Sequence, residues 1–367
     1  MKRCLELAEK GFGKVAPNPM VGCVIVHNNN VIGEGHHKKF GDAHAEVNAI
    51  NSVKDKSLLK NSILYVNLEP CSHFGKTPPC ADLIIRYKFK YVVIGTLDPN
   101  PLVCGKGIHK IASSGCDVKV GVLEDECREL NKRFYVFHEK QRPYVILKWA
   151  QTKDNYFGIL NLSAQSELVS DVPSERCRIP SDKFQISNFK SQKLVHRWRS
   201  EEQAIMVGTN TALTDNPQLT VRNVKGNNPL RIVIDKNLKI PSRFHLLDGS
   251  VPTIVFTAKK KSLKKNLEYV IIDFKKDVLK QIMNELHKRN IQSLIVEGGQ
   301  KLLNSFIEQN LWNEARVITS NKKLNDLSEK GNGIKSPKIN SPNSSKEKIG
   351  NDELKVYQNK REQFFNG

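Results

Sequence analysis

The chain has 367 residues, which is enough for two domains of ordinary size. Its lysines and arginines outnumber its acidic residues by 58 to 38, giving a formal net charge of +20. No segment is long and apolar enough to span a bilayer, and no basic stripe is interleaved with aromatic residues. We therefore expect neither a membrane nor a nucleic-acid partner, and assign part of the charge to an anionic, phosphorylated substrate. The eight scattered cysteines show no disulfide framework, which favours a cytoplasmic setting.

Short apolar runs alternate with helical periodicity through the first part of the chain. An amphipathic helix is predicted at its start, in residues 1–9. The predicted strands follow in chain order at 21–26, 31–35, 63–68, 91–95 and 115–122. Further helices are predicted at 44–50, 80–85 and 124–137. This alternation indicates an α/β sandwich, and we place a domain boundary after residue 143, which divides the chain into domains 1–143 and 144–367.

The sequence His44-Ala45-Glu46, followed by Pro70-Cys71 and then Cys80, is the most informative motif. One histidine and two cysteines can hold zinc through three protein ligands, and the open fourth position is typical of a catalytic site. Glu46 is not needed as a ligand and is free to shuttle a proton. The order of residue types predicts a zinc-dependent base deaminase. The alternative interpretation is a pair of buried structural cysteines and an unrelated surface histidine.

The loop between the two cysteine ligands is longer than the Pro-Cys-x-x-Cys spacing of nucleic-acid deaminases. It runs from Cys71 to Cys80 and contains a glycine and two prolines, which favour a tight, stiff turn. His73 lies in this loop. A fourth protein ligand would close the metal site, so we interpret His73 as a contact for the substrate.

The second part of the chain also reads as an α/β domain. Strands are predicted at 144–152, 231–235, 253–256 and 293–296, with helices at 277–288 and 301–308. Glu297 and two glycines stand between the last strand and the last helix, which suits a phosphate cradle or an ordinary tight turn. No Gly-x-Gly-x-x-Gly motif is present, so a Rossmann site is not predicted. Residues 332–348 are rich in Gly, Ser, Pro, Asn and Lys and predict a loop.

Four segments, at residues 17–23, 44–49, 68–80 and 98–101, closely resemble the deaminase half of the bifunctional riboflavin-biosynthesis deaminase/reductase family. The resemblance runs through nearly the whole chain and is thinnest between residues 156 and 184. It implies a cytidine-deaminase-like three-layer α/β/α domain followed by a dihydrofolate-reductase-like α/β domain. It also implies Asn18 as a second contact for the deaminase substrate, and a 98–107 loop that closes over the pyrimidine.

The resemblance implies two reactions with zinc and NADPH as cofactors. The first deaminates 2,5-diamino-6-(5-phosphoribosylamino)pyrimidin-4-one, and the second reduces the ribosyl group of the product to ribityl. The residues that match cofactor contacts are Gln151, Thr211, Asp215 and Gly299. Those that match contacts of the reductase substrate are Lys183, Arg199, Leu219, Arg222 and Glu297. The family also implies a homo-oligomer formed through the reductase domain.

Two positions depart from the family pattern. Asn155 stands where the family has a hairpin glycine, and Gln185 stands where it has an aromatic residue that helps to hold the cofactor. The second departure predicts looser binding of NADPH. Two alternatives stay open at this point: a tRNA-editing deaminase with an RNA-binding second domain, and a second domain that serves only as a scaffold.

Overall fold

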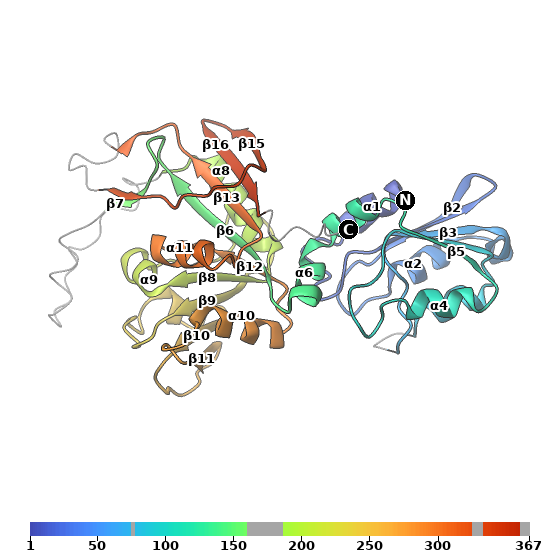
Figure 1. The fold of residues 1–367 in the computed structure, drawn as a ribbon, viewed down its shortest axis with the longest axis horizontal. Coiled ribbons are helices and arrows are strands. Elements are labelled where there is room, and N and C mark those ends of the chain that lie inside the picture. The colour runs from blue at the N-terminus through green and yellow to red at the C-terminus, as the bar shows by residue number, and fades with distance from the viewer. Residues whose placement is uncertain (75–77, 160–185, 325–332, 360–367) are drawn as a thin grey trace. The chain divides into compact units, whose positions relative to one another are not determined.

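The computed structural model describes residues 1–74, 78–159, 186–324 and 333–359. The chain forms two compact units (Figure 1). Residues 1–143 with 283–292 make the N-terminal unit, and residues 144–282 with 293–367 make the C-terminal unit. Among the helices of the described ranges, none is long and apolar enough to cross a membrane.

The N-terminal unit is built on a five-stranded sheet with the order β2-β1-β3-β4-β5. Its first three strands pair antiparallel and its last two join in parallel. The strands are β1 (Gly22–His27), β2 (Asn30–His36), β3 (Ile63–Val66), β4 (Tyr91–Ile94) and β5 (Asp117–Val120). The helices are α1 (Lys2–Glu9), α2 (Ala45–Ser52), η1 (Lys56–Asn61), α3 (Cys80–Arg86), α4 (Lys106–Ala112), α5 (Glu124–Leu130) and α6 (Lys132–Lys140).

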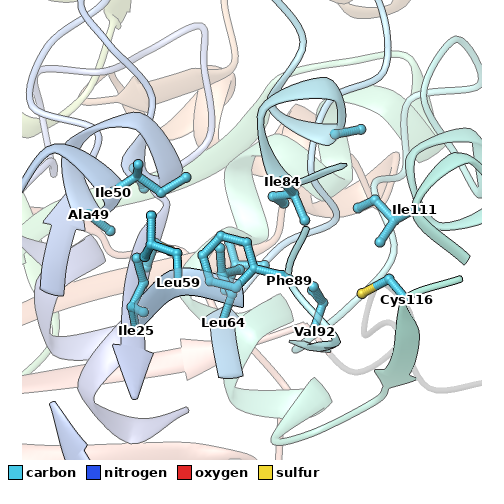
Figure 2. Close-up of a cluster of buried hydrophobic side chains, with 14 of the residues drawn as sticks. Ile25, Ala49, Ile50, Leu59, Leu64, Ile84, Phe89, Val92, Ile111 and Cys116 are labelled. Atoms are coloured by element: carbon cyan, nitrogen blue, oxygen red, sulfur yellow. The ribbon is translucent and has the colours of Figure 1, made fainter. Parts of the chain in front are cut away.

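Alternation along β1 shows why this sheet is covered on both faces. Successive side chains of a strand point to opposite faces. Cys23 and Ile25 join the large core cluster of Figure 2, which includes apolar residues of α2, α3 and α4. Val24, between them, packs instead with Cys4 and Leu7 of α1. Helices on both faces of one sheet give the three layers expected from the sequence.

Two boundaries in this unit differ from the sequence-based prediction. The predicted helix 124–137 is two helices, α5 and α6, because Asn131 between them has φ −100° and ψ 21°. The Asn131 side chain bonds both backbone groups of Met20, accepting from its N–H and donating to its carbonyl oxygen. The helix predicted from His44 begins at Ala45, and His44 is its extended N-cap residue.

The C-terminal unit contains a nine-stranded sheet with the order β11-β10-β9-β8-β12-β6-β13-β16-β15. The pairs from β11 to β13 are parallel, and β16 and β15 add an antiparallel edge. The strands of this sheet are β6 (Tyr144–Gln151), β8 (Ala204–Gly208), β9 (Leu230–Ile234), β10 (Thr253–Thr257), β11 (Leu267–Ile271), β12 (Ser293–Val296), β13 (Glu314–Thr319), β15 (Ser344–Ile349) and β16 (Asp352–Gln358). Central strands such as β12 are buried along their whole length, as parallel strands covered on both faces must be.

The helices of this unit are α8 (Phe189–Glu201), α9 (Thr209–Asp215), η2 (His245–Leu247) and α11 (Gln300–Glu308). Helix α10 (Val278–Lys288) begins in this unit, and its residues from Met283 onward belong to the N-terminal unit. A separate two-stranded sheet pairs β7 (Tyr156–Ile159) with β14 (Gly333–Lys335). The loop predicted for residues 332–348 is therefore wrong at 333–335 and 344–348, which form β14 and the start of β15, whereas residues 336–343 between them form no strand or helix. Backbone pairing with β7 and β16 orders a segment whose composition alone predicts no strand.

Candidate active sites

Three segments of the N-terminal unit bring the predicted metal ligands together. His44 is the N-cap of α2, Cys80 is the first residue of α3, and Cys71 lies in the loop that follows β3. The Nδ1 atom of His44 is 3.6 Å from the sulfur of Cys71 and 3.4 Å from that of Cys80. The three ligand atoms all lie within 4.8 Å of one another. Among the residues that the structure describes, these three form the group of His, Cys, Asp or Glu side chains placed to hold a metal ion.

The electrostatics of this cluster favour a bound cation. The hydrogen bond with Cys80, assisted by the contact with His44, lowers the pKa of Cys71 to about 4 against the effect of burial. The backbone N–H of Cys80 also donates to the sulfur of Cys71 at 3.3 Å. The same thiol contact raises the pKa of Cys80. Two sulfur ligands and one imidazole are the donor set that suits zinc, so the residues present fit this metal.

Glu46 lies beside the ligands but outside their group. It is in the first turn of α2 and is 3% exposed. Burial raises its pKa to about 6, and the charge of Cys71 adds to the effect. A carboxyl group that titrates close to neutral pH can both accept and release a proton during a reaction.

The two predicted substrate contacts of this unit are placed differently. Asn18 is half-buried, and its Nδ2 atom is 3.1 Å from Nε2 of His37. The ring of His37 lies 5.4 Å from that of His44, edge to face, and its Nδ1 atom is 3.2 Å from the carbonyl oxygen of Ala43. Asn18 is thus linked through His37 to a metal ligand. His73 is exposed and does not belong to the ligand group.

Sequence analysis gave no role to His37 or to Glu69. His37 is 2% exposed, and it belongs to no sequence motif that would have indicated a functional role. Glu69 is 4% exposed and accepts hydrogen bonds from backbone amides of the 98–108 segment. Its only sequence signal is its place two residues before Cys71.

Arg199 and Glu297, two of the residues that match contacts of the reductase substrate, form a largely buried ion pair in the C-terminal unit. The Nε and Nη2 atoms of Arg199 donate to the two carboxylate oxygens of Glu297 at 2.9 and 2.8 Å. Lys148 on β6, which sequence analysis did not select, joins them at 3.4 Å. Burial works to raise the pKa of Glu297, but the charges of Arg199 and Lys148 outweigh it and lower this pKa to about 2. The fork of Arg199 is therefore held by Glu297.

The run that contains Leu219 and Arg222 lies beside this ion pair. Leu219 is 3% exposed and has φ 53°, an unusual backbone conformation for a leucine. Arg199 donates to the carbonyl oxygen of Thr220 at 3.3 Å. The backbone N–H of Arg222 donates to Nδ1 of the buried His196 at 3.2 Å, while its exposed guanidinium bonds neighbouring side chains.

Thr211 and Gly299 are in direct contact. The N–H of Gly299, the N-cap of α11, donates to Oγ1 of Thr211 on α9 at 2.7 Å. This bond fixes the turn between β12 and α11 to the start of α9. Asp215, the last residue of α9, is exposed.

Gln151 ends β6 and is held by its neighbours. Its amide nitrogen donates to Asn155 and Thr319, and its oxygen accepts from the indole of Trp149. A cavity of about 250 Å³ opens next to it, lined by residues 186–189, Gln192, 320–322, Asn351 and Asp352. Lys183, predicted to bind substrate, and Gln185, the replaced aromatic position, lie outside the described residues.

The chain matches two family models. Residues 1–96 match the cytidine and deoxycytidylate deaminase zinc-binding region, and residues 143–324 match the RibD C-terminal domain. Together with the His-Cys-Cys cluster and the second α/β unit, these matches define a bifunctional enzyme, a zinc-dependent deaminase joined to an NADPH-dependent reductase.

Curated relatives match most of the chain. The riboflavin biosynthesis protein RibD of Aquifex aeolicus is 40% identical over 327 residues, covering 88% of this chain and 86% of that protein. The RibD of Bacillus amyloliquefaciens is 36% identical over 323 residues, covering 86% and 81%. A solved deaminase/reductase from Thermotoga maritima has a TM-score of 0.79 and 34% identity, covering 98% and 97% of the two chains. The chain belongs to the RibD family of bifunctional riboflavin-biosynthesis enzymes.

Several predictions from the sequence are thereby confirmed. They are the family, the two fold classes, the pair of enzyme activities, and zinc and NADPH as cofactors. The alternative of a tRNA-editing deaminase with an RNA-binding second domain is not supported by these relatives.

Proposed function

We propose that residues 1–143 carry out the first step, the hydrolytic deamination of 2,5-diamino-6-(5-phosphoribosylamino)pyrimidin-4-one. His44, Cys71 and Cys80 hold the zinc ion. The observation that carries this assignment is the convergence of the three ligand atoms within 4.8 Å, with buried Glu46 beside them. When bound there, zinc supplies the Lewis acidity that lowers the pKa of a water molecule from about 15.7 to about 7.

Glu46 moves the protons of this reaction. Its carboxylate takes a proton from the attacking water and delivers it to the amino group, which leaves as ammonia while the ring carbon gains an oxygen. Its pKa, which burial raises to about 6, lets one group do both at neutral pH.

Asn18 and His73 orient the pyrimidine, and the 98–107 loop closes over it. Asn18 contacts His37, and the ring of His37 packs against that of the metal ligand His44. The carboxyl group of Asp98 on this loop is 7% exposed, and burial raises its pKa to about 7. One oxygen of this carboxyl group accepts from the backbone N–H of Asn100 at 2.8 Å, and an amino-pyrimidine offers donors for its remaining acceptor positions.

Residues 144–367 carry out the second step, the reduction of the ribosyl group to ribityl with NADPH. Gln151, Thr211, Asp215 and Gly299 contact the cofactor, and Lys183, Arg199, Leu219, Arg222 and Glu297 contact the substrate. The buried pair of Arg199 and Glu297 is the observation that supports the substrate site, since it places a fixed charge next to Leu219 and Arg222. When bound, NADPH would supply the hydride that reduces the ribosyl group, with a proton taken up from solvent.

Glu46→Gln tests the deaminase half. The variant keeps the shape of the side chain and the three metal ligands but cannot shuttle a proton. We expect the kcat for ammonia release to fall by about 10²–10⁴-fold. Zinc content should stay at the wild-type level, and NADPH oxidation with deaminated substrate should be unchanged.

Glu34→Gln is the matched control, because Glu34 lies in the same unit and its carboxylate bonds the exposed Arg3 at the surface. Its ammonia release should match wild type. If Glu46→Gln released ammonia as fast as this control, Glu46 would not be the proton shuttle.

We further propose that the enzyme works in the cytoplasm as a homo-oligomer formed through the reductase domain, without a nucleic-acid partner. The scattered free cysteines support the compartment. Light scattering of the purified chain measures the oligomeric state. Titration with RNA at rising salt concentration tests for a nucleic-acid partner, since binding through phosphates weakens steeply with salt.

A further inference from the structure

Glu69 is a buried carboxylate whose partners are all backbone amides. One oxygen, Oε1, accepts from the N–H groups of Gly107 and Ile108 at 2.9 and 3.3 Å. The other, Oε2, accepts from those of Asp98 and Gly105 at 3.3 and 2.9 Å. A carboxylate has about four acceptor positions, so this one is saturated. Within the described ranges it forms no ion pair with a lysine, arginine or histidine.

These four bonds tie the 98–107 loop and the first turn of α4 to the segment that carries a metal ligand. Burying a charge is costly unless its hydrogen-bonding capacity is filled. Here four backbone amides of the loop and of α4 fill it, so these hydrogen bonds stabilise the conformation in which the loop lies against Glu69. Glu69 stands two residues before Cys71, and its own N–H donates to the carbonyl oxygen of Thr96 at 3.0 Å.

The contact between the two segments is also sterically close. A Cβ atom added to Gly107 would overlap the carbonyl oxygen of Pro70, so only glycine lets α4 approach the residue next to Cys71. The loop has internal turns that make it a stiff body. Asp98 accepts from the N–H of Asn100 at 2.8 Å, and the Asn100 side chain accepts from that of Leu102 at 3.0 Å.

We propose that Glu69 is a positioning residue of the deaminase, which fixes the 98–107 loop beside the zinc-ligand segment so that the pyrimidine meets a preformed loop. This rests on the proposed role of that loop in binding the substrate. Glu69 touches neither substrate nor metal in this scheme, and it acts through the four amides that it holds.

Glu69→Gln is a sharp test because it changes one oxygen into an amide donor. In either orientation, the new NH₂ group faces two backbone N–H donors and cannot accept from them. We expect KM for the pyrimidine to rise by about tenfold or more while kcat stays within about threefold of wild type, because the loss falls on substrate positioning. Zinc content and NADPH oxidation should be unchanged.

Two controls separate positioning from general destabilisation. Ile25→Val removes one methylene from the core and leaves the loop untouched, so it should lower the unfolding midpoint without raising KM. Gly107→Ala should raise KM as Glu69→Gln does, since it pushes the loop away from Pro70. A fall in kcat at constant KM, a loss of zinc, or unaltered kinetics in Glu69→Gln would overturn the proposal.

Hydrogen exchange on the wild-type protein gives an answer even if the variants do not fold. The amides of Asp98, Gly105, Gly107 and Ile108 should exchange slowly, because all four donate to a buried acceptor. Rapid exchange at these amides would overturn the positioning role. A chain with slow exchange and no deaminase activity would instead contradict the proposed function, so the two failures are distinguishable.

Discussion

The two units position their charged groups by different means. In the N-terminal unit, three uncharged or titratable ligands converge within 4.8 Å and require an added cation to complete the site. In the C-terminal unit, the carboxylate of Glu297 pairs with both Arg199 and Lys148 without any added group, so the three side chains together keep one positive charge. The comparison teaches that the first site needs a metal to hold its ligands together, whereas the second holds its charged side chains through contacts within the chain.

Removal of zinc should give the largest difference between the activities of the two units. A chelator that strips the His44, Cys71 and Cys80 site should abolish ammonia release, because the Lewis acid that activates water is lost. NADPH oxidation with deaminated substrate should continue. Both rates are measured on the same sample before and after zinc is restored. Loss of both activities together, with the chain still folded, would contradict two independent sites.

Glu297→Gln should impair the C-terminal unit in the way that loss of zinc impairs the N-terminal unit. It leaves the buried charges of Arg199 and Lys148 without their partner, which costs about 3–5 kcal/mol of folding stability. NADPH oxidation should fall by at least about 10²-fold, since the substrate site loses its fixed carboxylate. Urea unfolding and a steady-state NADPH assay measure the two effects.

Glu314→Gln provides the control for Glu297→Gln. Glu314 accepts from the buried Arg316 at 2.5 Å and from the hydroxyl of Tyr144 at 3.0 Å in the same unit, and it is not among the proposed substrate residues. It should lower stability but leave KM for substrate near wild type. An equal effect of the two variants on KM would show that the Glu297 pair is only structural.

A smaller effect is expected from the titration of His196. Burial lowers the pKa of this histidine to about 4, and the charges of Arg199 and Arg222 add to the effect while Glu297 opposes it. The unfolded chain binds this proton near pH 6.5 and the folded unit only near pH 4. The folding stability that neutral His196 contributes above pH 6.5 is therefore lost as the pH falls toward 4, by about 1.4 kcal/mol per pH unit.

Urea midpoints at pH 7.5, 6 and 5 measure this slope. His196→Gln cannot take up the proton but can still accept from the N–H of Arg222, so its slope over the same range should be shallower. Parallel slopes for the two proteins would exclude His196 as the cause.

The smallest effect should come from the hairpin between β6 and β7. Asn155 has φ 65° and so occupies the left-handed conformation for which the family uses glycine. Asparagine tolerates this conformation better than other side chains. Asn155→Gly should therefore change stability by at most about 1 kcal/mol. A larger loss would show that the bond between Asn155 and Gln151 matters more than the backbone conformation.

The metal site could be predicted from the sequence because its chemistry restricts residue types. The order of His44, Cys71 and Cys80, with Glu46 near the histidine, is specific to zinc-dependent deaminase sites. The architecture could likewise be predicted, since strands such as β12 are continuous apolar runs. The resemblance to a family then added residues of the second site that periodicity could not select.

The remaining features depend on contacts between distant segments. Lys148 lies 149 residues from Glu297, and a lysine in a strand has no local mark of an ion pair. Glu69 is recognisable only through the amides of residues 98–108, which no local pattern connects to it. Strands β14 and β15 form from a segment of loop-like composition because partners far along the chain supply their hydrogen bonds.

The central claim is that one chain carries two sites that act in sequence and independently. Its most direct test compares Glu46→Gln and Glu297→Gln as full-length proteins, alone and mixed, with the diamino substrate and NADPH. Each variant alone should fail to yield the reduced product, the first releasing no ammonia and the second releasing ammonia without oxidising NADPH. The mixture should restore both, and a mixture that stayed inactive although each variant kept its remaining activity would contradict the account.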